Sequence, residues 1–221
     1  MEKYIKNSRN HANGMDLLQS ICDRTVNAAF FDPQYRGVLD KLNYGNEGKY
    51  RGKARANLPQ MNTETIMNFI KELNRILIPS GYLFIWVDKF HLCEGINEWL
   101  EGTYFKITDM ITWVKTTKNG KFEMGMGYRS RHCSEYVVIT QKHPQKVIGH
   151  WNDHKLLDVW PESVTKTHPH CKPIELQRRL IEAVTKKGDL IVDPAAGGYS
   201  VLEACRQSGR EFLGCDIENE D

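Results

Sequence analysis

The segment AAFFDPQY, residues 28–35, brings a carboxylate, a rigid proline and an aromatic ring to the end of an apolar run. Asp32 could accept one hydrogen bond from an amino group. The carbonyl of Pro33 could accept a second one, because the proline ring fixes the local backbone. Tyr35 could stack on an aromatic ligand, and Gln34 lies between these groups.

This set of residues suits one kind of chemistry, the alkylation of an amino group conjugated to an aromatic ring. Such a nitrogen is a poor nucleophile because its lone pair is delocalised. Two acceptors aimed at its N–H bonds favour a pyramidal nitrogen and free the lone pair. Catalysis of this kind depends on positioning and preorganised dipoles rather than on a covalent intermediate.

A second segment, residues 189–217, is typical of a site for a nucleoside-type ligand. Its sequence, DLIVDPAAGGYSVLEACRQSGREFLGCDI, contains two predicted strands that end at Asp193 and Asp216. Glycines in the turn after the first strand let a ligand approach the backbone. An acid about 20 residues further on can bind ribose hydroxyls. The turn is not GxGxxG and the chain has no GxxxxGK[ST], so a ligand with a ribose but no phosphates fits best.

The elements that must position these residues alternate between strands and helices. Apolar runs predict strands at 26–32, 81–88, 104–115, 134–142, 189–193 and 211–217. Periodic apolar residues predict helices at 62–77, 91–102, 172–188 and 200–209, the first capped by Asn62 and stopped by Pro79. This order predicts an α/β fold with a doubly wound, mostly parallel, Rossmann-like sheet and helices on both faces. Ligands of such sheets bind beyond the carboxyl ends of the strands, where Asp32 and Asp193 are expected.

Length and charge suggest one domain with a polyanionic partner. The 221 residues are 40% hydrophobic and carry a formal net charge of +2, which fits a single domain over 1–221. Basic residues gather in two long segments, 36–61 and 116–133, and are either phosphate contacts or solvated loops. The candidate nucleic-acid contacts are Arg36, Lys49, Arg51, Lys53, Arg55, Lys118, Lys121, Arg129 and Arg131.

Other sequence features indicate the cellular location of the protein and whether a membrane or a metal ion is expected. None of the six cysteines forms a CxxC pair and no signal peptide is recognised, so a reduced, cytoplasmic location is expected. No apolar run approaches the length of a membrane span, so no membrane partner is expected. No metal is expected either, because the following residues do not complete a set of four ligands: His150, His154, His168, His170 and Cys171. Glu135 is interpreted as orienting a neighbouring strand or Arg131 rather than as a catalytic base.

Four motifs in register resemble the S-adenosylmethionine-dependent DNA amino-methyltransferases, which act on adenine N6 or cytosine N4. DPQY is similar to the family's DPPY, and HPHCKPIELQRRLI, residues 168–181, to its HPxxKPxxLxxxLI. The 189–217 segment is similar to DPFxGSGTT with its following strand, and HANGMDLL, residues 11–18, to the segment that closes over the cofactor adenine. The catalytic motif precedes the cofactor motif, which is the circularly permuted β-class order.

The resemblance implies a role for each matched residue. Asp32, Pro33 and Tyr35, with Gln34, would hold the target base. The residues implied for S-adenosylmethionine are Asn13 near its adenine, Asp216 at its ribose, and Lys172, Asp193, Ala195, Gly197 and Gly198 at its methionine end. An aspartate in the first motif position points, in the family, to the N6 of adenine.

The implied function is therefore a site-specific DNA methyltransferase, as found in restriction–modification systems, acting on a flipped-out adenine. Segment 143–167 lies where the family places target recognition, and its shortness suggests a short or weakly specified sequence. The alternatives are N4-cytosine or RNA methylation, or a catalytically degenerate nucleic-acid-binding subunit. A second copy of the chain is a candidate partner.

Three residues depart from the family pattern. Gln34 replaces a proline and Ala195 replaces a phenylalanine. Tyr199 stands where a glycine is usual, and we expect its ring to fill the space beside Ala195. The loss of the second proline leaves one backbone angle unlocked.

Overall fold

The computed structural model describes residues 3–35, 60–125, 129–144, 151–165 and 171–217. Its helices are α1 (Gly14–Ser20), α3 (Thr63–Ile76), α4 (Lys89–Glu94), α5 (Ile174–Val184) and α6 (Ser200–Ser208), with a 3₁₀ turn at Asn97–Leu100. Its strands are β1 (Asn10–His11), β2 (Val26–Phe31), β3 (Leu77–Val87), β4 (Phe105–Lys115), β5 (Ser134–Lys142), β6 (Val159–Glu162), β7 (Leu190–Asp193) and β8 (Glu211–Asp216). None of the described helices is long and apolar enough to cross a membrane.

The strands form one sheet in the order β1-β8-β7-β2-β3-β5-β4-β6. All neighbouring pairs are parallel except the two that involve β5, which runs antiparallel to both β3 and β4. The predicted doubly wound, mostly parallel sheet is thereby confirmed.

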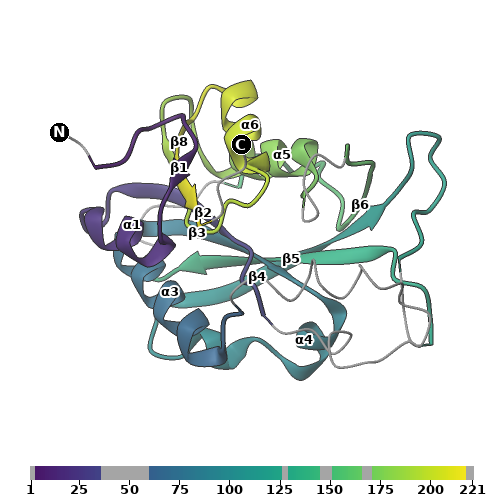
Figure 1. Ribbon diagram of the computed structural model, residues 1–221, viewed down its shortest axis with the longest axis horizontal. Helices are drawn as coiled ribbons and strands as arrows, with labels where there is room; N and C mark the ends of the chain where they lie inside the picture. The colour runs from purple at the N-terminus through teal and green to yellow at the C-terminus, as the bar shows by residue number, and fades with distance from the viewer. Residues whose placement is uncertain (1–2, 36–59, 126–128, 145–150, 166–170, 218–221) are drawn as a thin grey trace.

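Helices cover both faces of the sheet, α1 and α3 on one side and α5 and α6 on the other (Figure 1). Successive residues of β2 contribute alternately to two hydrophobic cores, because successive side chains of a strand point to opposite faces of the sheet. Ala29 and Phe31 pack toward α1 and α3, whereas Ala28 and Phe30 pack toward α5 and α6. Burial on both faces explains why the strand reads as a continuous apolar run.

The register of the strands brings the two predicted sites to one edge. Ala29 pairs with Val192, so β2 and β7 end side by side, with Asp32 one residue past β2 and Asp193 the last residue of β7. Because β5 is antiparallel, its first residues reach the same edge, and Glu135 pairs there with Trp113 near the end of β4. We call this edge, at the carboxyl ends of β2, β3 and β7, the catalytic edge.

Several element boundaries differ from the sequence prediction. The Asn62 cap is confirmed, since its side-chain oxygen accepts the Thr65 N–H at 2.8 Å. Pro79, however, does not stop α3: the helix ends at Ile76, and Pro79 lies inside β3. The helix expected over 91–102 is two short pieces, α4 and the 3₁₀ turn, divided at Gly95 with φ +91°. The short β6, within segment 143–167, was not predicted and extends the sheet beside β4.

Candidate active site

The DPQY segment forms a tight turn immediately after β2. The Tyr35 N–H donates to the Pro33 carbonyl at 2.8 Å, which closes a three-residue γ-turn around Gln34. The Gln34 carbonyl accepts the Met61 N–H at 2.7 Å, so the exit of the turn is fixed as well. These hydrogen bonds supply the rigidity that a second proline would have given. The Pro33 carbonyl keeps one lone pair for a further donor.

Asp32 is held at the catalytic edge by a lysine from a distant part of the chain. Lys172 Nζ lies 2.7 Å from Asp32 Oδ2, and no described residue donates a hydrogen bond to the other oxygen, Oδ1. The resemblance implied that Lys172 belongs beside the cofactor's methionine. Its ammonium instead contacts the catalytic motif, although the residue also lines the neighbouring cavity.

Glu135 completes this charged cluster. Its Oε2 lies 3.0 Å from Lys172 Nζ, and its Oε1 forms an ion pair with Lys115. Burial works against the charge of both Lys172 and Glu135, but the ion pairs outweigh it: the pKa of Glu135 falls to about 2 and that of Lys172 rises above its usual value. Of the two interpretations of Glu135, the contact with a neighbouring strand is present, since Lys115 is the last residue of β4, whereas the described ion pairs of Glu135 are with Lys115 and Lys172 and not with Arg131. An acid at the start of a strand that reaches the catalytic edge was the signal that could have identified it.

The cofactor turn places two acids around a small-residue loop. Asp193 is 5% exposed and its Oδ1 accepts the Ala195 N–H at 3.1 Å. Burial, together with the nearby Asp32 and Asp216 charges, raises the pKa of Asp193 to about 8. Asp216, at the end of β8, accepts the Gly197 N–H at 3.0 Å. The predicted residues of this turn are thus brought together beside Asp32.

The N-terminal segment packs directly against the same turn. A Cβ atom added to Gly14 would lie 2.1 Å from the Pro194 carbonyl oxygen, so glycine is required at this contact. Asn13 precedes it, and its side-chain oxygen accepts the Met15 N–H at 2.8 Å as the cap of α1. Segment 11–18 therefore lies against the cofactor turn, and its closure over the cofactor adenine stays a prediction.

Tyr199 does not fill the space beside Ala195. Its ring packs in the core under α5 and α6, edge-on to Phe212 at 6.3 Å between centroids, whereas Ala195 packs on the opposite core. Tyr199 has a left-handed backbone, φ 55° and ψ 33°, which is the conformation a glycine adopts without strain. Its hydroxyl donates to the Asn10 carbonyl at 2.8 Å and ties β1 to the cofactor turn.

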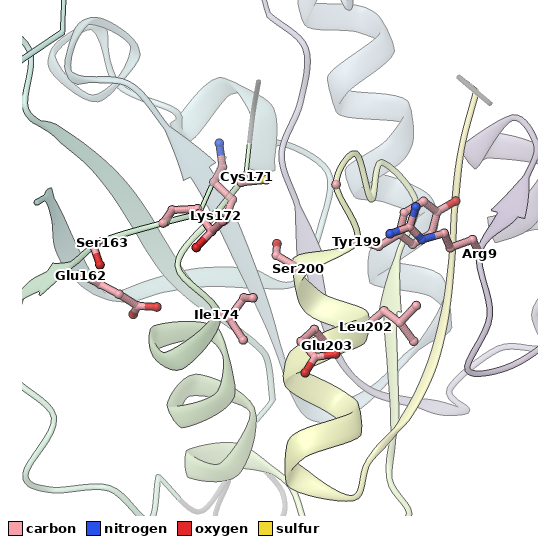
Figure 2. Close-up of a pocket in the computed structure, with 13 residues that line it drawn as sticks. Arg9, Glu162, Ser163, Cys171, Lys172, Ile174, Tyr199, Ser200, Leu202 and Glu203 are labelled. Atoms are coloured by element: carbon pink, nitrogen blue, oxygen red, sulfur yellow. The ribbon is translucent and has the colours of Figure 1, made fainter. Parts of the chain in front are cut away.

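A cavity of about 350 Å³ opens between the starts of α5 and α6. Figure 2 shows Lys172 and Ser200 on either side of it, and Arg9 lying over the ring of Tyr199. The Arg9 guanidinium is 5.2 Å from that ring centroid. Because Gly198 and Lys172 both line the cavity, it adjoins the cofactor turn and the residue whose ammonium contacts Asp32. A buried acid, glycines at a helix start and an acid-ended strand fit S-adenosylmethionine, which carries an α-ammonium and a ribose.

Tyr35 belongs to a cluster of three rings. Its centroid lies 4.0 Å from that of His91 and 6.0 Å from that of Trp99. His91 in turn contacts Asp88, which caps α4 at the end of β3. Burial, and then the charge of Asp32, raises the pKa of Tyr35 well above its usual value. No local sequence pattern connects His91 with Tyr35, because the contact joins the ends of two different strands.

The candidate nucleic-acid contacts fall into two groups. Lys118, Lys121, Arg129 and Arg131 are exposed on the connection between β4 and β5, which leaves the catalytic edge. The others lie outside the described residues: Arg36, Lys49, Arg51, Lys53 and Arg55. Among the described residues no group of three or more His, Cys, Asp or Glu side chains is arranged to hold a metal ion.

Comparison with known proteins gives a family for this geometry. A family model described as DNA methylase, of the N6/N4 amino type, matches residues 26–221 and so includes both the DPQY turn and the cofactor turn. The chain belongs to the S-adenosylmethionine-dependent DNA amino-methyltransferases. S-adenosylmethionine is therefore its cofactor and DNA its substrate.

Relatives cover nearly the whole chain of this DNA methyltransferase. It is 56% identical over 213 residues to the type II methyltransferase M.HhaII of Haemophilus parahaemolyticus. That alignment covers 96% of this chain and 91% of the relative. It is 30% identical to M2.LlaDCHI of Lactococcus lactis subsp. cremoris, with coverages of 95% and 84%.

Solved structures share the fold at lower identity. The PvuII DNA methyltransferase, described as cytosine-N4-specific, matches with a TM-score of 0.69 and 15% identity over 96% of this chain and 82% of that one. The M1.HpyAVI–SAM complex matches with a TM-score of 0.64 and 19% identity, over 96% and 94%. These matches support the fold alone.

Proposed function

We propose that this chain transfers a methyl group from S-adenosylmethionine to the exocyclic N6 of an adenine flipped out of DNA. The observation that carries the proposal is the state of Asp32. Its carboxylate stands at the catalytic edge beside the cofactor turn, with Oδ2 on Lys172 and Oδ1 without a described donor.

In this proposal the DPQY turn supplies the acceptors for the target amino group. Asp32 Oδ1 accepts from one N–H and the remaining lone pair of the Pro33 carbonyl from the other. Both atoms are fixed before the base arrives, one by Lys172 and the other by the γ-turn. Tyr35 offers its partly exposed ring to the base, and its contact with His91 keeps the ring in place.

The cofactor turn supplies the methyl donor's site. When bound, S-adenosylmethionine would supply an electrophilic methyl group for the amino nitrogen of the base. Asp193 would hold the α-ammonium of its methionine, and Asp216 the ribose hydroxyls. The backbone at Gly197 and Gly198 leaves room for the ligand, and the N-terminal segment with Asn13 closes over the adenine.

The exposed lysines and arginines of the β4–β5 connection contact the phosphates of the duplex in this proposal. They position the DNA rather than read its sequence, since phosphate contacts carry no direct sequence information. The approach of DNA to the catalytic edge would bring an extruded base toward Asp32.

The test is the transfer of labelled methyl groups from S-adenosylmethionine to unmethylated DNA, followed by nucleoside analysis. We expect N6-methyladenine. Asp32→Ala should bind S-adenosylmethionine normally and lose at least about 100-fold in transfer rate, because it loses a preorganised acceptor. Asp109→Ala, an exposed aspartate on β4, is the matched control and should transfer at the wild-type rate.

Two outcomes would contradict the proposal in different ways. Label recovered as N4-methylcytosine would keep the site and change its base. An Asp32→Ala variant as fast as the wild-type protein would remove the carboxylate from the chemistry altogether.

A further inference from the structure

Lys172 lies between two carboxylates and above an aromatic ring. Its ammonium is 2.7 Å from Asp32 Oδ2 and 3.0 Å from Glu135 Oε2, and 5.5 Å from the centroid of Trp86. The lysine side chain is only 10% exposed. An ammonium has three donors, and two of them are committed to different carboxylates. Its position is therefore set by both acids.

The four charged groups alternate in sign along this cluster. Lys115 contacts Glu135, Glu135 contacts Lys172, and Lys172 contacts Asp32, so the formal charges sum to zero. A buried ammonium needs carboxylate partners, because desolvation of an unpaired charge is costly. Without the Glu135 charge, Asp32 would be the remaining carboxylate in contact with Lys172. The ammonium would then be free to move across both oxygens of Asp32.

Such a shift would weaken Asp32 as an acceptor for the target base. The Oδ1 atom would be shared with Lys172, and the charge of the carboxylate would be more fully neutralised. Glu135 opposes this by holding Lys172 on the Oδ2 side. The side chain of Glu135 is not needed to pair the strands, since the β4–β5 ladder is formed by the backbone.

We propose that Glu135 is a positioning residue for methyl transfer: it shares Lys172 with Asp32 and so keeps Oδ1 of Asp32 free for the amino group of the target base. The inference rests on the proposed function of Asp32. Glu135 does not touch the substrate in this scheme and acts entirely through Lys172.

The first test is Glu135→Gln, which keeps the shape of the side chain and removes its charge. We expect kcat to fall by at least about tenfold, because a preorganised acceptor is lost. The dissociation constant for S-adenosylmethionine and the KM for DNA should stay within about twofold of the wild-type values, since no group that binds either molecule is removed. Glu211→Gln breaks a surface ion pair with Lys6 and is the matched control, with kcat unchanged.

A double-mutant cycle separates positioning from mere support of the fold. If Glu135 acts through Lys172, then Glu135→Gln added to Lys172→Gln should cause no further fall in kcat. A doubly substituted chain that is slower than Lys172→Gln alone would overturn the proposal. This comparison takes Lys172→Gln as its reference and removes both members of the Lys172–Glu135 ion pair, so it decides the question even where the single Glu135 variant fails to fold.

The outcomes also separate this inference from the proposed function. A wild-type protein that transfers no methyl group to DNA would refute the proposed function. A wild-type protein that is active, with Glu135→Gln equally active, would refute this inference alone.

Discussion

At the scale of single residues, the acid of the cofactor turn lies in a buried environment that disfavours its charged form. Asp193 is 5% exposed and has one backbone donor, Ala195, while two further acids stand near it. Burial raises its pKa to about 8, so its carboxyl group is largely protonated in the free protein at pH 7. A cationic ligand group would favour the ionised form.

Binding of S-adenosylmethionine should therefore become tighter as the pH rises. If Asp193 holds the α-ammonium, the free protein loses a proton from this residue on binding, and the affinity rises as pH approaches 8. Well below pH 8 the dissociation constant should fall by up to about tenfold per pH unit, and it should level off above that value. Calorimetric titrations between pH 6 and 8.5 measure this directly. Asp193→Asn should bind more weakly with little pH dependence, and a wild-type affinity that does not change with pH would disprove the assignment.

At the scale of elements, the start of α5 depends on a residue outside the helix. Pro173 occupies the cap position and has no side-chain acceptor. Glu162, at the end of β6, caps the helix instead. Its two carboxylate oxygens accept the backbone N–H groups of Glu175 at 2.9 Å and Leu176 at 3.0 Å. A carboxylate also interacts favourably with the positive end of the helix dipole. The short edge strand thereby fixes the helix that follows Lys172.

Removing this cap should destabilise the protein, because it removes the acceptors at the start of α5. Glu162→Ala should lower the free energy of unfolding by about 1–2 kcal/mol, because it leaves orphan N–H groups at the start of α5. Glu203→Ala on α6, whose carboxylate pairs with Arg206, is the control and should change stability by less than about 0.5 kcal/mol. Denaturant unfolding measures both. Equal stabilities for the two variants would show that Glu162 is not a structural cap.

At the scale of the whole molecule, the positive and negative charges nearly balance, but the basic residues are unevenly distributed. The formal net charge is +2, yet the exposed residues of the β4–β5 connection include several basic ones at the catalytic edge. Two of them, Lys118 and Lys121, flank the tight turn at Gly120. Their position, rather than the net charge, favours DNA approaching from this side.

The salt dependence of DNA binding should report these contacts. Lys118→Ala combined with Lys121→Ala should weaken binding and reduce the slope of log affinity against log salt by about 2, since each phosphate contact contributes about 0.9. Lys186→Ala combined with Lys187→Ala removes the same charge near the start of β7, at the opposite edge, and should leave the slope unchanged. Equal slopes for both double variants would exclude the β4–β5 connection from the interface.

The sequence by itself determined the local features of this protein. The strands β2, β5, β7 and β8, the Asn62 cap of α3 and the two acid-ended strands of the site follow from apolar runs and short motifs. Such patterns are local because side-chain periodicity and capping act within a few residues. The order of the motifs was also sufficient to indicate the family.

Only the tertiary structure decided which distant groups meet. The Lys172 contact with Asp32, the role of Glu135, and the placement of Tyr199 away from Ala195 all join segments that strand pairing brings together. A buried charge takes the partner that packing offers within a few ångströms, and the sequence does not show that distance.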